Sequence, residues 1–132
     1  MEIAIGIAGL IIALVTFKYS FFKKPVEELE HLKIQFKVNQ KLSLKVQSDL
    51  SNYISQNNCS SELINDRMTF SEYQTFLEDN HKSNLSEEVY VKINNKFTKT
   101  IIDSMIESLN NQFVKYQDIE NELKVLFSKI KN

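Results

Sequence analysis

The pattern of hydrophobic positions begins with a long uninterrupted apolar run. Residues 3–17 carry no charged side chain, and the first lysine is Lys18. Extended to Phe22, the run would form a helix about 30 Å long, which matches the hydrocarbon core of a bilayer. No lysine precedes the run, and bulky aromatic residues rather than a small-residue cleavage site follow it. The pattern therefore predicts a retained transmembrane anchor over residues 1–24 rather than a cleaved signal peptide.

The charges around the anchor predict its orientation. The flanking lysines all follow it, so residues 25–132 should form a cytoplasmic domain beneath the inner (plasma) membrane of the cell. Within the anchor, small residues recur four positions apart, a spacing that lets helix backbones approach closely in lipid. These expected membrane helix-packing positions are Ala4, Ala8, Gly9 and Ala13.

A long amphipathic helix is predicted directly after the anchor, over residues 26–56. Pro25 suits the first turn of a helix, and the glutamates that follow it suit the positive end of the helix dipole. Residues 32–47 also alternate between apolar and polar side chains, which is the period of a strand hairpin that turns at Asn39 and Gln40. Asn-Gln is a poor two-residue turn, because the favoured turns place glycine second. The helix is favoured, and the hairpin remains the alternative.

Two shorter helices are predicted in the middle of the chain, after a loop. Thr69 and Glu72 have the spacing of a capping box, and the helix that they begin should end near Asn80. Ser86 can cap the next helix. Residues 89–93 are rich in β-branched side chains and are also compatible with a strand.

The last part of the chain has the clearest helical period. Apolar side chains recur with the spacing of heptads, and Gln112 is the single polar exception among these positions. The pattern predicts a helix near 45 Å long, from about 30 residues. The expected fold is all-α: one transmembrane helix followed by a small bundle in which this helix runs antiparallel to the first long helix. The heptad positions are Ile102, Met105, Leu109, Tyr116, Ile119, Leu123, Leu126 and Ile130.

Composition excludes several classes of enzyme. Both glycines, Gly6 and Gly9, lie in the anchor, so residues 10–132 lack the glycine that phosphate-binding loops, nucleophile elbows and dinucleotide folds need. The net charge of −1 gives no basic field for nucleic acid. Cys59 is the only cysteine, which excludes an intrachain disulfide, and we interpret it as a spare loop thiol. We therefore expect no enzymatic activity, no cofactor and no nucleic-acid partner.

Two E-x-x-H motifs are the weak candidates for metal binding. Glu28 with His31 and Glu78 with His81 have the i, i+3 spacing by which one helix can bind a metal twice. Carboxylate-bridged di-iron bundles use two such motifs together with two further glutamates. Neither motif lies in a clear core stripe, so solvated surface histidines are the preferred interpretation and no metal is expected.

Lysines dominate one side of the first long helix, close to the anchor. On a helix, residues four apart form a ridge that turns gradually around the helix axis. This ridge would face the bilayer and attract anionic lipid. A solvated surface is the preferred interpretation, and contact with lipid is the alternative. The expected lipid-facing residues are Lys23, Lys24, Lys33, Lys37, Lys41 and Lys45.

These observations favour a single-pass membrane-anchored helical interaction protein, either an oligomer or an accessory subunit of a membrane complex. Its expected partners are membrane lipids and a protein, which is another subunit or a second copy of the chain. One alternative is a membrane-active effector or toxin whose transmembrane helix oligomerises through its small residues. The other is a metal-binding helical bundle. The sequence leaves open whether the anchor is passive or membrane-active.

Overall fold

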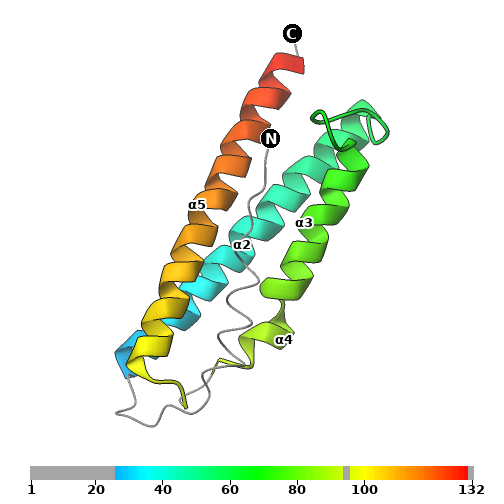
Figure 1. Ribbon diagram of the computed structural model, residues 1–132. Coiled ribbons are helices and arrows are strands. Elements are labelled where there is room, and N and C mark those ends of the chain that lie inside the picture. The colour runs from blue at the N-terminus through cyan, green and yellow to red at the C-terminus, as the bar shows by residue number, and fades with distance from the viewer. Residues whose placement is uncertain (1–25, 94–95, 131–132) are drawn as a thin grey trace.

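The computed structural model describes residues 26–93 and 96–130, which form helices joined by loops (Figure 1). The predicted all-α class is confirmed for this part of the chain: it contains no strand, and its one β-bridge is the isolated pair Leu63 and Thr69. The helices are α2 (Val26–Asn57), α3 (Phe70–Asn84), α4 (Glu87–Tyr90) and α5 (Lys99–Ile130).

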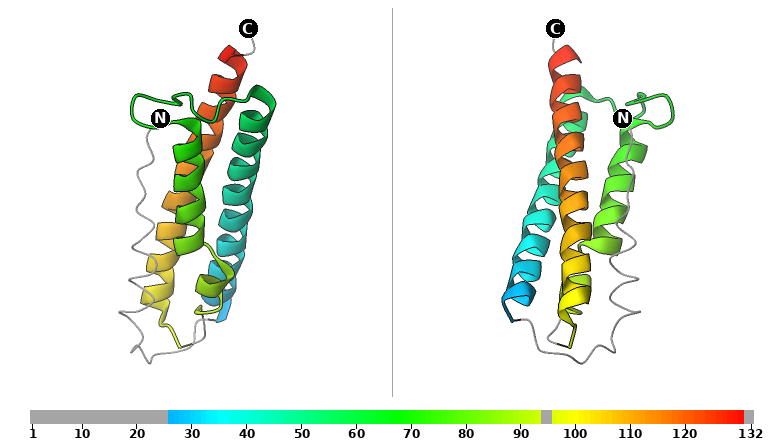
Figure 2. Two further views of the ribbon diagram at one scale, coloured as in Figure 1. Left: turned by 90° about the vertical axis from the view of Figure 1, so that its right-hand side faces the viewer. Right: turned by 60° about the vertical axis from the view of Figure 1, so that its left-hand side comes forward.

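The two long helices, α2 and α5, run side by side in the same direction, so the expected antiparallel pairing is wrong. Residue numbers rise together along both helices, from one end of the bundle to the other (Figure 2). Three contacts at successive levels mark this direction: Asn39 with Gln112, Lys45 with Glu120, and Tyr53 with Phe127.

The chain between the long helices explains their parallel arrangement. α3 packs on α2 in the opposite direction, and α4 with the residues after it brings the chain back to the level at which α2 begins (Figure 1). Lys99, the first residue of α5, is close enough to Glu28 for their charges to interact. An antiparallel pair of long helices needs a short connection. Here residues 58–98 contain a third helix that supplies the return path.

α2 is one continuous helix, which confirms the predicted helix and excludes the hairpin. Ile34, Val38 and Leu44, whose alternation resembles a strand, are exposed. Asn39 and Gln40, the expected hairpin turn, are buried within the helix. The helical period prevails because the buried apolar side chains lie three or four residues apart at each end of the set, and the buried Asn39 and Ser43 continue this spacing between Phe36 and Val46. The buried apolar side chains are Leu32, Phe36, Val46, Leu50 and Tyr53.

Both predicted helix caps are present. Thr69 Oγ1 accepts a hydrogen bond from the Glu72 N–H at 3.1 Å, and the Glu72 carboxylate accepts one from the Thr69 N–H at 2.9 Å. This reciprocal pair is a capping box, which satisfies two backbone donors at the start of α3. Ser86 Oγ caps α4 by accepting from the Val89 N–H at 3.4 Å.

The end of α3 and the segment after it differ from the prediction. α3 continues to Asn84 rather than ending near Asn80, and it thereby buries Asn84 and the following Leu85. The region 89–93, for which a strand was the alternative, contains the end of α4 at Tyr90 and a turn. Burial of Asn84 and Leu85 therefore favours the longer α3, and burial of Val89 favours the short helix α4 over a strand.

One hydrophobic core joins α2, α3 and α5. Tyr73 and Leu77 contribute to it from α3, and Tyr53 stacks on Phe127 with ring centroids 4.1 Å apart. Burying a side chain of this size stabilises the fold by roughly 1.5–3 kcal/mol. The buried heptad positions of α5 are Ile102, Met105, Leu109, Tyr116, Ile119 and Leu123.

A layer of buried polar side chains crosses this core, and the sequence pattern showed it only as the exception at Gln112. Asn39 Nδ2 donates to Gln112 Oε1 at 2.6 Å and to the Leu109 carbonyl oxygen at 2.8 Å. Gln40 Nε2 donates to the Leu85 carbonyl oxygen at 2.6 Å and joins α2 to the junction of α3 and α4. Because an unpaired buried polar group is costly, these bonds select one register of α2 against its neighbours.

Candidate interaction surfaces

The predicted lysine ridge lies along α2, and the structure gives Lys37 partners from another helix. Lys37 Nζ donates to Glu87 Oε1 at 2.5 Å and lies 4.0 Å from the centroid of the Tyr90 ring, both in α4. The hydrogen bond from Lys37 is the main cause of the lowered pKa of the Glu87 carboxyl. Lys37 therefore holds α4 against α2.

Lys45, at the other end of the ridge, also has a structural role. Its Nζ donates to Asp49 Oδ2 at 2.8 Å and to Glu120 Oε2 at 2.6 Å, which links α2 to α5. These two hydrogen bonds, first the one to Asp49, raise the pKa of the Lys45 ammonium. Because the Lys45 side chain is about half exposed, water screens the pair and its contribution to stability is small.

Lys33 and Lys41 differ from the other two lysines. Among the described residues, no ion pair engages either of them. They lie beside Ile34, which is 63% exposed, and Val38, which is 39% exposed. Together with neighbouring side chains they line an open groove of about 490 Å³. The groove residues are Glu30, Lys33, Ile34, Lys37, Val38, Lys41 and Tyr90.

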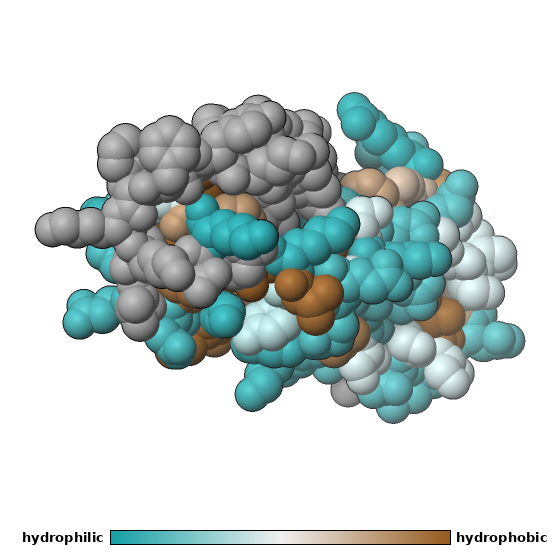
Figure 3. All heavy atoms as spheres, turned by 90° about the horizontal axis from the view of Figure 1, so that it is seen from below, coloured by the Kyte–Doolittle hydropathy of each residue, from teal (hydrophilic) through white to brown (hydrophobic). Residues whose placement is uncertain are grey.

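The apolar side chains in this ridge were not predicted as part of a surface site. The signal was present in the sequence, because Ile34 and Val38 are the residues that produce the strand-like alternation in residues 32–47. Seen from the end at which α2 and α5 begin, hydrophobic residues occur as separate patches among hydrophilic ones (Figure 3).

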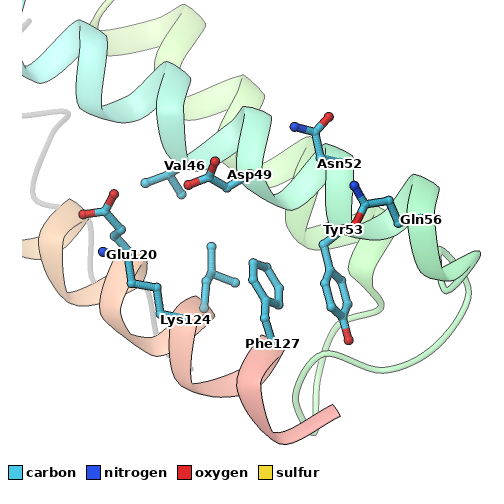
Figure 4. A pocket seen from close by; sticks show the side chains of 9 residues that line it. Val46, Asp49, Asn52, Tyr53, Gln56, Glu120, Lys124 and Phe127 are labelled. Atoms are coloured by element: carbon cyan, nitrogen blue, oxygen red, sulfur yellow. The ribbon is translucent and has the colours of Figure 1, made fainter. Parts of the chain in front are cut away.

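A second groove, of about 200 Å³, lies between α2 and α5 near their C-terminal ends (Figure 4). Tyr53 and Phe127 face each other across the two helices at one end of it. The carboxylates of Asp49 and Glu120 belong to its lining, and both are bound by Lys45. Because the single Lys45 ammonium holds both carboxylates, these acids form a bridge between helices rather than a convergent acid–base pair. The lining residues are Val46, Asp49, Asn52, Tyr53, Gln56, Glu120, Leu123, Lys124 and Phe127.

The two E-x-x-H motifs lie in different places. Nδ1 of His81 is 2.9 Å from Ser43 Oγ, at the contact of α3 with α2, and burial lowers the pKa of its imidazole. His31 is exposed and precedes Ser43 on α2 by twelve residues, about 18 Å along the helix. Glu28 and Glu78 therefore do not share one site with both histidines. Within residues 26–93 and 96–130, no three His, Cys, Asp or Glu side chains are grouped to hold a metal.

Cys59 lies in the loop after α2, as the sequence indicated, but its side chain is buried in the core. Burial, followed by the nearby charge of Glu62, raises the pKa of the thiol. The neutral thiol is therefore favoured, and Cys59 serves as a small apolar core residue.

The predicted anchor lies outside the described residues. This applies to the helix-packing positions Ala4, Ala8, Gly9 and Ala13 and to the first two lysines of the ridge, Lys23 and Lys24. Among the helices that the structure does describe, none is long and apolar enough to span a bilayer.

Comparison with protein-family models, curated proteins and solved structures finds no match to this chain.

Proposed function

We propose that the protein is a single-pass membrane protein whose helical domain, on the cytoplasmic side, associates with another protein or with further copies of itself. The observation that carries the proposal is the uncharged run over residues 3–17, followed within a few positions by lysines and by the start of α2 at Val26. A helix of this composition is stable in lipid, whereas in water its apolar side chains would be exposed on all sides.

The shape of the described domain supports a role in association rather than in chemistry. Its long helices bury one shared core, and several large apolar side chains remain on the outside of different helices. Such side chains on an elongated bundle offer contact area to a neighbouring helix. The exposed ones on α2 and α5 are Ile34, Val38, Leu44, Val114 and Val125.

Membrane fractionation of the full chain tests the anchor. We expect the protein in the membrane fraction, resistant to carbonate and released by detergent. Leu10→Lys places a charge in the apolar run, which costs about 2.5–3.5 kcal/mol of insertion free energy, and should move protein to the soluble fraction. Leu10→Ile is the matched control and should stay in the membrane. A wild-type chain that is soluble without detergent would overturn the proposal.

Light scattering of the full chain in detergent tests the association. We expect a mass greater than that of one chain, or a partner that co-purifies in fixed ratio. A monomer that binds nothing in native membranes would contradict the interaction function while leaving the anchor intact.

A further inference from the structure

The outer face of α2 combines positive charge with exposed apolar side chains. Between Glu30 and Asp49 the chain contains no acidic residue and four lysines. The structure separates these lysines: Lys37 and Lys45 are held by acids of α4 and α5, whereas Lys33 and Lys41 belong to no ion pair within the described residues. We refer to Lys33, Ile34, Val38 and Lys41 as the α2 face.

Ile34, Val38 and Lys41 lie on the same side of the helix, because they are separated by three, four or seven positions, and Lys33 lies at the edge of this side next to Ile34. Ile34 is 63% exposed between the two lysines, and Val38 adjoins it one turn later. Large apolar side chains flanked by unpaired lysines are typical of helices that lie in a membrane interface. The apolar groups enter the boundary of headgroups and acyl chains, and the lysine stems extend back to the phosphates.

We propose that the α2 face lies on the headgroups of an anionic bilayer, so that the bundle rests along the membrane instead of standing upright on it. The inference rests on the proposed anchor. α2 begins at Val26, directly after the apolar run, and Ile34 follows eight residues later, about 12 Å along the helix. The face is therefore within reach of the surface at which the anchor would leave the bilayer.

Charge distinguishes this face from the exposed Val114 of α5. Val114 of α5 is 52% exposed, but Glu107 and Asp118 lie on the same side of its helix, at spacings of seven and four. Acidic neighbours repel an anionic bilayer. Ile34 also has one acid, Glu30, four positions before it in the same groove, but Lys33 and Lys41 outnumber it there. Val114 is therefore a matched control for Ile34.

The test uses the full chain in lipid nanodiscs, with Cys59→Ala and one introduced cysteine, Ile34→Cys or Val114→Cys, that carries a nitroxide label. Paramagnetic relaxation by oxygen and by a water-soluble nickel chelate reports whether the label lies in lipid or in water. In discs of phosphatidylcholine with phosphatidylglycerol, the label at position 34 should gain oxygen accessibility and lose nickel accessibility. The label at position 114 should remain accessible to nickel.

Charge variants test the lysines directly. Lys33→Gln with Lys41→Gln should restore nickel accessibility at position 34, whereas Lys82→Gln with Lys129→Gln, at exposed positions of α3 and α5, should not. Protection at position 34 that persists in discs of phosphatidylcholine alone would contradict the proposal. So would equal exposure of both labels in anionic discs. A chain that fails to enter discs overturns the anchor, whereas a chain that inserts and leaves position 34 in water overturns only this inference.

Discussion

Asn39 and Gln112 lie in the middle of an apolar core and are hydrogen-bonded to each other across 73 positions of the sequence. A purely apolar seam would allow α2 and α5 to shift by a turn with little change in buried area. The amide pair is satisfied in one register only, so a shift would leave polar groups unpaired in the core.

Replacing one member of this pair should destabilise the fold. Asn39→Ala leaves the Gln112 amide without its partner, and we expect the free energy of unfolding to fall by about 1–3 kcal/mol. Urea unfolding of the full chain in detergent measures this. Asn52→Ala, exposed on the same helix, should change little. Asn39→Leu with Gln112→Leu removes both amides and should recover much of the loss; a double variant no better than Asn39→Ala would contradict the pairing argument.

His81 should make stability depend on pH. Burial against α2 lowers its pKa below the ordinary value of 6.5, so the unfolded chain takes up a proton at a higher pH than the folded one does. The stability that the fold gains from keeping the His81 imidazole neutral is fully present above pH 6.5. It is lost as the pH falls toward the lowered pKa of the folded state. Unfolding free energies across this range should show the decrease. His81→Gln should remove it, and the exposed His31→Gln should retain it.

At the scale of elements, most local features could be predicted. α2 ends one residue beyond the predicted 26–56, and the box at Thr69 and Glu72 forms as the spacing indicated. These features depend on contacts within four residues, which the sequence displays directly. The direction of α5 could not be predicted, because it depends on the path of residues 58–98.

The parallel direction of α2 and α5 can be measured with pairs of spin labels in the full chain carrying Cys59→Ala. Asn52 and Lys124 line the same groove, so labels at these two positions should be close. Thr100 precedes Lys124 by 24 residues, about 36 Å along α5, so a label there should be far from position 52. Double electron–electron resonance should therefore give a much shorter distance for 52 with 124 than for 52 with 100. The reverse order would indicate antiparallel helices.

At the scale of the whole molecule, the parallel arrangement places the starts of α2 and α5 at one end of the bundle. If residues 1–24 anchor the chain, this is the end nearest the exit from the membrane. With the α2 face on the bilayer, the exposed Val114 of α5, between Glu107 and Asp118, would be a surface that stays available to a protein partner.

Periodicity and short-range spacing were enough to predict the helices, their caps and the apolar core positions of the two long helices. The sequence also showed the lysine ridge, although not which of its members are free. The direction of α5, the burial of Asn39 and Gln40, and the ion pairs of Lys37 and Lys45 with Glu87 and Glu120 depend on how the helices pack. The hydrogen bonds involved join residues 45 to 75 positions apart. Their geometry arises only when a third helix returns the chain along α2, and no local pattern encodes that path.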